Sequence, residues 1–175
     1  MSQFNLAVAG WHDFYMMIGT AAATLIGLLF VSLSLNADMI LRKENYDVRI
    51  FAAQTFTSFL CVLMFAVLFL IPNQEPAGLG LPLLGIDLFG LYITARRFFQ
   101  LRRNEPRSWG RGSLARRFAI PTICFMTLLI IAITVLLGYT GGLYWLVPVM
   151  ILLILYASIN AWDLMLRLRE PVVEA

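Results

Sequence analysis

Asp87 is an acidic residue in the middle of an apolar stretch, and its position makes it a candidate for chemistry. The run from 79 to 95 around it contains no Lys, Arg or His that could neutralise a carboxylate. An acid inside a bilayer costs at least about 2.5–3.5 kcal/mol, so it is expected to face a partner or a water-filled cavity. Pro82 and the nearby glycines could break the helix there and free carbonyl groups for a ligand. A structural hydrogen bond to another helix is an equally good explanation, and the sequence leaves the charge state of Asp87 open.

A second set of polar side chains follows one face of the first apolar stretch. At about 100° per residue, seven positions fall within about 40° of one line along the helix. They are Asp13, Thr20, Thr24, Gly27, Val31, Ser34 and Asp38. The opposite side, expected against lipid or apolar helices, holds Ile18, Ala22, Leu25, Leu29 and Leu33. The stripe is either a helix–helix interface whose hydroxyls bond to their own backbone, or the lining of a narrow path between symmetry-related copies.

Small residues recur on the same helix at an interval of four. Gly19, Ala23 and Gly27 form a small-xxx-small row, which lets two helices approach closely in a membrane. This row predicts that the first helix packs tightly against another helix.

Further polar residues lie inside the second and fifth apolar stretches. Gln54 and Ser58 share a helical face, and an amide such as Gln54 must face protein or water because lipid offers no hydrogen bond. Near the end of the fifth stretch, Asn160 and Asp163 share a stripe that is best explained by packing and anchoring. We list these residues with Asp87 as intramembrane polar candidates.

Catalytic and metal chemistry find little support in the sequence. His12 is the only histidine and stands beside Asp13 without an evident nucleophile. The two cysteines, Cys61 and Cys124, lie in separate apolar runs and form no CxxC pair. No phosphate or cofactor motif is present, so we expect a protein that is not an enzyme and holds neither metal nor cofactor.

The elements that carry these residues are membrane helices. Hydrophobic residues make up 61% of the 175 positions and charged residues 13%, which is too little polar surface for a soluble domain of this size. A helix needs about 20 apolar residues to cross the hydrocarbon. Five stretches qualify, at 14–36, 50–71, 79–95, 118–137 and 143–166, and they predict a single all-α transmembrane domain over 1–175. The third is short, and a cytoplasmic loop over 96–117 follows it.

Basic residues set the expected orientation. All 13 Lys and Arg residues lie after the first helix, after the third helix or in the C-terminal tail. Positive loops stay in the cytoplasm, so the N-terminus is expected outside and the C-terminus inside. Arginines of the long loop are expected to contact anionic lipid head groups rather than nucleic acid. These are Arg96, Arg97, Arg102, Arg103, Arg116 and Arg117.

The first helix resembles the opening of a group of small bacterial multi-pass membrane proteins of uncharacterised activity. The resemblance is carried by the segment from Trp11 to Tyr15 and by the segment from Gly19 to Asn36. Some members of that group are labelled modulators of a membrane-anchored AAA protease. The resemblance implies a bacterial inner-membrane protein, and it supplies no catalytic residue and no substrate.

These observations lead to two hypotheses for function. The first is a homo-oligomer that associates through the first helix and forms a small pore, which would favour cations because its candidate lining has acids and hydroxyls without a basic residue. The alternative is a non-catalytic accessory or regulatory subunit that packs against a larger membrane protein, such as a protease or a transporter. Membrane lipids are expected contacts in both cases.

Overall fold

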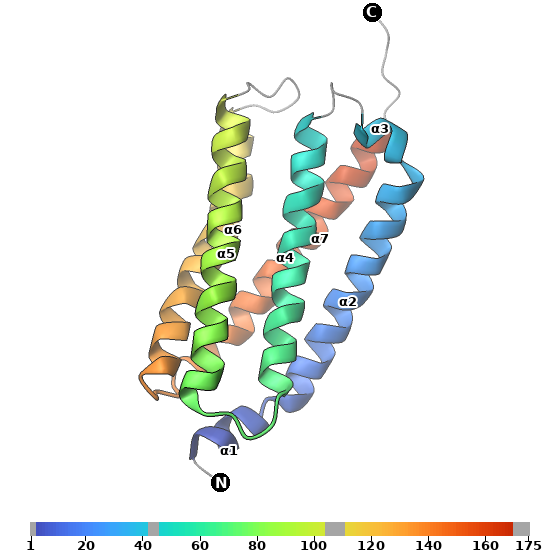
Figure 1. Ribbon diagram of the computed structural model, residues 1–175. Coiled ribbons are helices and arrows are strands. Elements are labelled where there is room, and N and C mark those ends of the chain that lie inside the picture. The colour runs from blue at the N-terminus through green and yellow to red at the C-terminus, as the bar shows by residue number, and fades with distance from the viewer. Residues whose placement is uncertain (1–2, 42–45, 104–110, 170–175) are drawn as a thin grey trace, which may run out of the picture.

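The chain is a bundle of long helices, as the computed structural model shows in Figure 1. The structure describes residues 3–41, 46–103 and 111–169, except for the side chains at positions 3, 5, 41, 47, 111–117 and 167–169. All regular elements in this part of the chain are helical. They are α1 (Gln3–Ala9), α2 (His12–Leu35), α3 (Ala37–Leu41), α4 (Tyr46–Leu70), α5 (Pro76–Arg103), α6 (Arg111–Leu136) and α7 (Leu143–Arg169).

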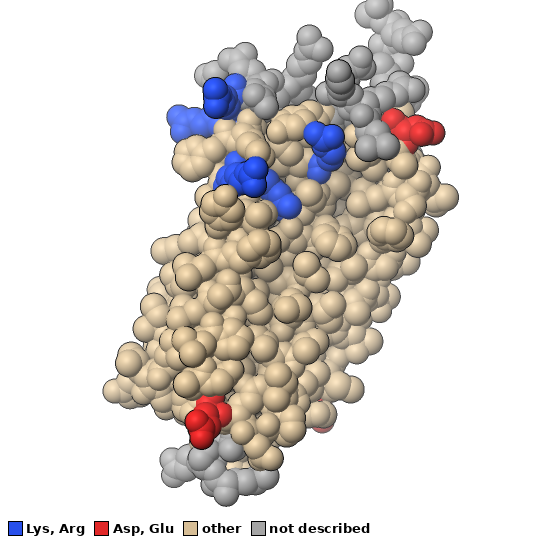
Figure 2. Space-filling view, in the orientation of Figure 1, with Lys and Arg blue, Asp and Glu red and all other residues tan. Residues whose placement is uncertain are grey.

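Five of these helices, α2, α4, α5, α6 and α7, are long and apolar enough to cross a membrane. The protein is therefore a multi-pass membrane protein, and the all-α expectation with five spans is confirmed. Figure 2 shows the described Lys and Arg side chains of one face gathered at one end of the bundle, above a broad surface without them. We call this end the basic end. It carries Arg49, Arg96, Arg97, Arg102 and Arg103.

Helix α4 lies at the centre of the bundle and α2 at its edge. Helix α4 packs against α2, α5 and α7, whereas α2 packs mainly against α4 and only weakly against α7. The burial of the two spans reflects this difference, because 56% of the α4 span is buried but only 22% of the α2 span. Helices α5 and α6 form a tightly packed pair, and α7 passes behind α4 (Figure 1) and packs against both α4 and α6. One long face of α2 is therefore not covered by any other described residue of the chain.

The third membrane helix differs from its prediction. Helix α5 runs without interruption from Pro76 to Arg103, so it is neither short nor broken at Pro82. The glycines do not break the helix. At Gly80 and Gly90 the missing side chain lets Leu136 and Phe125 of α6 approach the helix backbone. Arginine is a good helix former, and the segment expected to be a loop from residue 96 onward begins as two further turns of helix.

Three of the other four membrane helices, α2, α4 and α6, also begin before their predicted first residue. Helix α6 already begins at Arg111 and ends where Gly138 adopts a positive φ of 81°, which a glycine tolerates after a helix. Two short helices, α1 and α3, were not expected. Helix α1 inserts Phe4 and Val8 into the main core. Helix α2 ends at Leu35 and α3 starts at Ala37, so Asp38 belongs to a separate element from the rest of its stripe.

Candidate functional site

The stripe predicted on the first helix lies on the side of α2 that faces away from the bundle. Every one of its seven members is exposed, from Asp13 to Asp38. Ala23 is exposed beside them. We call the part of this surface on α2 the outward face: Asp13, Thr20, Ala23, Thr24, Gly27, Val31 and Ser34. The residues predicted opposite the stripe face the protein's own core, since Ile18, Ala22 and Leu29 are buried and Leu25 and Leu33 are half-buried.

The hydroxyls of the outward face donate to their own helix. Thr20 Oγ1 donates to the carbonyl of Met16 at 2.8 Å, and Thr24 Oγ1 donates to the carbonyl of Thr20 at 2.9 Å. Ser34 Oγ donates to the carbonyl of Phe30 at 2.8 Å. Each hydroxyl proton is therefore satisfied without a second helix, as in other helices that carry Ser and Thr in a membrane. The outward face can therefore lie against either lipid or another helix.

The small-residue row divides between two environments. A Cβ atom added at Gly19 would lie 2.9 Å from Cβ of Ala66, so Gly19 permits the close approach of α2 and α4. At Gly27 no described heavy atom lies within 4 Å of the corresponding position, which opens away from the bundle. Gly19 thus contributes to the packing of α2 against α4, whereas Gly27 lies in an open part of the surface.

A second group of polar residues lies between α4 and α5, toward the basic end. We call it the polar seam, and it consists of Gln54, Thr57, Ser58, Thr94 and Arg97. The first four residues are buried. Gln54 Nε2 donates to Thr94 Oγ1 at 2.9 Å across the two helices. Ser58 Oγ donates to the carbonyl of Gln54 at 3.2 Å. Gln54 and Ser58 therefore face protein, as the sequence predicts for Gln54.

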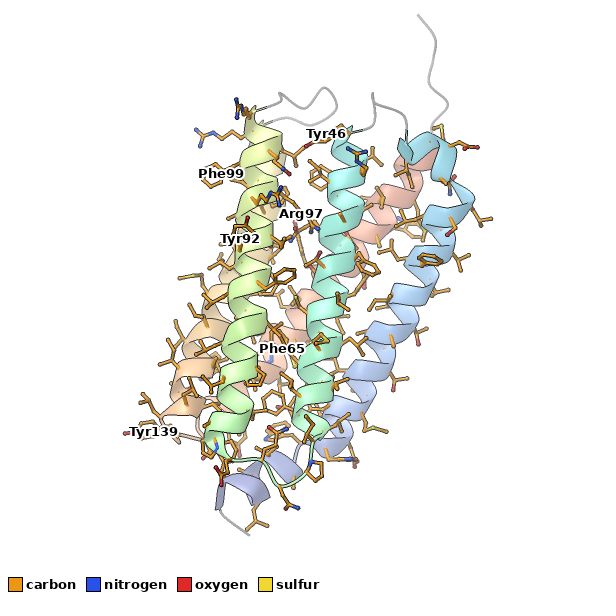
Figure 3. The ribbon with its side chains drawn as sticks, in the orientation of Figure 1. Tyr46, Phe65, Tyr92, Arg97, Phe99 and Tyr139 are labelled. Atoms are coloured by element: carbon orange, nitrogen blue, oxygen red, sulfur yellow. The ribbon has the colours of Figure 1, made fainter. Side chains whose placement is uncertain are left out.

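Arg97 lies in this seam and not among lipid head groups, where it was expected. Its Nη1 atom lies 2.9 Å from the carbonyl oxygen of Ala53, 3.0 Å from Gln54 Oε1 and 2.9 Å from Thr57 Oγ1. Figure 3 shows Arg97 between α5 and α4. The reason for the difference is the length of α5, because the extra turns place Arg97 on the buried face, one turn beyond Thr94. All three acceptors that Nη1 contacts are uncharged.

Asp87 lies on the same face of α5, deeper in the bundle. The buried residues of this face are Leu79, Gly80, Leu83, Asp87, Gly90, Thr94 and Leu101. Asp87 is 1% exposed, and neither carboxyl oxygen has a hydrogen-bond partner among the described residues. The structural alternative for Asp87, a hydrogen bond to another helix, is therefore not seen in this part of the chain.

Phe125 separates Asp87 from the polar seam. A Cβ atom at Gly90 would lie 2.6 Å from Phe125 Cε1, so the ring of Phe125 lies directly against the α5 backbone at Gly90. Gly90 is one turn from Asp87 and one turn from Thr94 on the same face. An aromatic ring therefore occupies the level between the acid and the nearest hydrogen-bonded network.

The two candidate regions are separate in the structure. The outward face of α2 points away from the bundle, whereas Asp87 lies on α5, which is not among the main neighbours of α2. A path lined by the outward face would not include Asp87. The sequence identifies the α2 stripe and Asp87 as polar candidates, and it does not place them next to each other in space.

The other predicted residues take peripheral positions. Arg96, Arg102 and Arg103 are exposed at the basic end, and the side chains of Arg116 and Arg117 are outside the described part of the structure. Asn160 and Asp163 are half-buried on α7, and each interacts with another group. His12 Nδ1 and Asp13 Oδ1 lie 3.2 Å apart on the surface at the opposite end. Within the described residues, no cluster of His, Cys, Asp and Glu could hold a metal ion.

Thr94 and Arg97 are seam residues of α5 that the sequence did not single out for this role. A signal was present, because Asp87, Gly90, Thr94 and Arg97 follow one another at helical intervals of three and four. The comparisons with known proteins add no family, since no family model, no curated protein and no solved structure matches the chain.

Proposed function

We propose that the protein is a non-catalytic membrane protein that works as a homo-oligomer, with copies meeting along the outward face of α2. The observation that carries this proposal is the position of the stripe. Six of the seven predicted residues are exposed on α2, the span with the smallest buried share, and Asp38 is exposed on α3 directly after it. A purely lipid-facing helix needs no run of small and hydroxylated residues there.

A second copy of α2 is the occupant that this surface fits best. Small residues drive helix association in membranes because backbones can come close and gain van der Waals contact. Gly27 provides an open position at the middle of α2, and the hydroxyls beside it already donate to their own carbonyls. Such a face can pack against its own copy around a two-fold axis without leaving a buried hydrogen-bond donor unpaired.

The experiment compares two glycines that both open away from the protomer. Gly27 on α2 and Gly85 on α5 are exposed, and neither has a heavy atom within 4 Å of an added Cβ. Gly27→Leu should convert the purified oligomer to a 19.8 kDa protomer in mild detergent, whereas Gly85→Leu should keep the oligomer. Equal masses for the two variants would contradict an interface on α2. A complex with another protein that Gly27→Leu removes would favour the accessory role instead.

The proposed setting is the bacterial inner membrane, with the basic end in the cytoplasm. The positive-inside rule supports this orientation, because the described basic side chains lie at one end. A membrane-impermeant thiol reagent applied to intact cells should label Gly141→Cys and leave Arg103→Cys unlabelled. The reverse pattern would invert the proposed topology.

A second candidate function is a cation path on the axis of the oligomer. It is favoured by Asp13 and Asp38, which are exposed toward the two ends of the α2 stripe. Acidic groups at the mouths of a path concentrate cations. In lipid vesicles, Asp13→Asn should lower cation flux while the oligomer mass stays unchanged. An intact oligomer without flux would leave assembly as the role of α2 and remove the pore.

A further inference from the structure

Asp87 has an environment that the assembly through α2 does not explain. Its carboxyl group is buried on the inner face of α5, and both oxygens are without a hydrogen-bond partner among the described residues. Intramembrane acids are expensive and usually bind a proton, an ion or a partner group. The inference drawn from Asp87 concerns the interior of a protomer, so it stands whether or not copies associate.

The register between α4 and α5 identifies what faces Asp87. Gln54 on α4 bonds to Thr94 on α5, and the two helices are antiparallel neighbours. Moving seven residues along each helix in opposite directions is two turns on both, and it leads to Cys61 on α4 and Asp87 on α5. Cys61 lies within electrostatic range of both Asp87 and Arg97, which agrees with this register.

No described cation contacts Asp87. The only titratable side chains in the bundle interior on the described parts of α4 and α6 are Cys61 and Cys124, while Tyr46 and Arg49 lie at the basic end of α4. On α5 itself, Arg97 shares the face of Asp87 but is ten residues away, about 15 Å along the helix, and Nη1 is bonded to neutral groups. An unpaired carboxylate is poorly tolerated in such surroundings. The occupant that fits two unpartnered carboxyl oxygens in this packing is a proton.

A hydrogen-bonded route leads from the basic end toward the acid. It starts at Arg97 and continues through Gln54 to Thr94, with bonds of 3.0 and 2.9 Å. The hydrogen bonds end at Thr94, and the ring of Phe125 lies against Gly90, between Thr94 and Asp87 along α5. Apolar constrictions of this kind control the entry of water and ions in membrane proteins.

We propose that Asp87 is a proton-binding site that exchanges its proton with the basic end of the bundle through the polar seam, with the Phe125 ring as the barrier. In the exchange the O–H bond of the carboxylic acid breaks, the electron pair stays on the carboxylate and the proton passes to water that enters from the basic end. The reverse step restores the neutral acid. Arg97 is the nearest described positive charge along the route.

Infrared spectroscopy of the full chain in phosphatidylcholine vesicles tests the site. A protonated carboxylic acid has a C=O stretching band that is separate from the carboxylate bands and shifts to lower frequency in D₂O. The wild type should show this band at neutral pH, Asp87→Asn should lack it, and Asp13→Asn should keep it because Asp13 is an exposed acid. A spectrum without the band, or a band that persists in Asp87→Asn, would overturn the proposal.

The route is tested by the rate of the shift after transfer to D₂O. Gln54→Leu should slow it about fivefold to tenfold, the factor expected when one hydrogen-bonded step is lost. The matched control is Gln74→Leu, since Gln74 follows α4 at the opposite end, and the rate should not change. Slower exchange in Gln74→Leu than in Gln54→Leu would place the access at the other end and overturn the route.

A second variant keeps the test valid if Gln54→Leu does not fold. Phe125→Ala removes the barrier and should accelerate the exchange about tenfold or more, as expected when water reaches the site past a deleted constriction. Phe65→Ala is its control, because Phe65 is an equally buried ring on α4 (Figure 3), whereas the three atoms nearest to an added Cβ at Gly90 all belong to Phe125. Equal acceleration in both variants would show general loosening of the bundle and contradict a barrier at Phe125.

Discussion

The outward face of α2 and the polar seam use the same residue types for different purposes. Both place Thr and Ser at helical intervals within long apolar helices. On α2, Thr20, Thr24 and Ser34 donate only to their own backbone. In the seam, Thr94 and Thr57 accept bonds from side chains of the facing helix. The presence of Gln54 and Arg97, which are long enough to bridge two helices, makes the difference.

This comparison teaches that a hydroxyl stripe alone does not identify a polar path. A hydroxyl that bonds to its own helix is neutral toward its surroundings and suits an interface with lipid or protein. A hydroxyl that serves a Gln or Arg is part of a network in which each lost partner leaves a buried group unsatisfied. The same substitution should therefore have different effects in the two regions.

The largest effect is expected for Arg97. Arg97→Met removes the donor that lies within hydrogen-bond distance of Ala53 O, Gln54 Oε1 and Thr57 Oγ1. We expect the free energy of unfolding in detergent to fall by about 2–4 kcal/mol, since bonds to charged groups contribute about 1.5–3 kcal/mol each. Arg96→Met is the matched control, because Arg96 is the exposed neighbour at the same depth. Equal losses in a denaturant titration would show that Arg97 has no role beyond its charge.

A smaller effect is expected from one added methyl group. Gly90→Ala would place Cβ 2.6 Å from Phe125 Cε1, whereas Gly27→Ala on the outward face meets no heavy atom within 4 Å. Overpacking of this kind costs about 1–3 kcal/mol. The same change at Gly27 should stabilise the helix slightly, because alanine is a better helix former than glycine. Thermal unfolding of the two protomers in detergent measures the difference, and a Gly90→Ala protein as stable as the wild type would contradict the close packing of α5 and α6.

The smallest effect is expected from a comparison of Thr94 in the polar seam with Thr24 on the outward face. Thr94→Val keeps the shape of the side chain but removes the acceptor for Gln54 Nε2. It should lower the free energy of unfolding by about 1–2 kcal/mol, the effect of leaving one buried donor unpaired. Thr24→Val removes a hydroxyl that donates only to its own helix, and its effect should be close to zero. If the two valine variants were equally stable, the distinction between stripe and seam would lose its energetic basis.

The sequence predicted the architecture better than the sites. A run of about 20 apolar residues identifies a membrane helix, because backbone groups without hydrogen bonds are too costly in lipid and a helix satisfies all of them internally. The sequence could predict that Gly27 and Thr24 share a helix face. It could not predict that this face is exposed, because the sequence of one helix does not show which side another helix covers. Ile18 and Leu29 were assigned to lipid or apolar helices, and the structure shows that the occupant is the protein's own core.

The seam was missed because the third helix was ended too early. Arginines after Ala95 were counted as loop charges that set topology, so Arg97 was placed among head groups. Continuing the helical interval from Asp87 through Gly90 and Thr94 leads directly to Arg97. Charge counting along the chain cannot distinguish an arginine that turns outward, such as Arg96, from one that turns inward, because both occur at the same depth.

The short connection between α4 and α5 has a consequence for biogenesis. Only Ile71 to Glu75 separates the two helices, so they leave the ribosome in succession and form a helical hairpin. Helix α5 is the least apolar of the five spans, and it brings Asp87 and Arg97 into the bilayer. Its hydrogen-bond partners Gln54 and Thr57 on α4 have already been synthesised at that moment. We expect the insertion machinery to release α4 and α5 into lipid as a pair, so that neither polar face meets hydrocarbon alone.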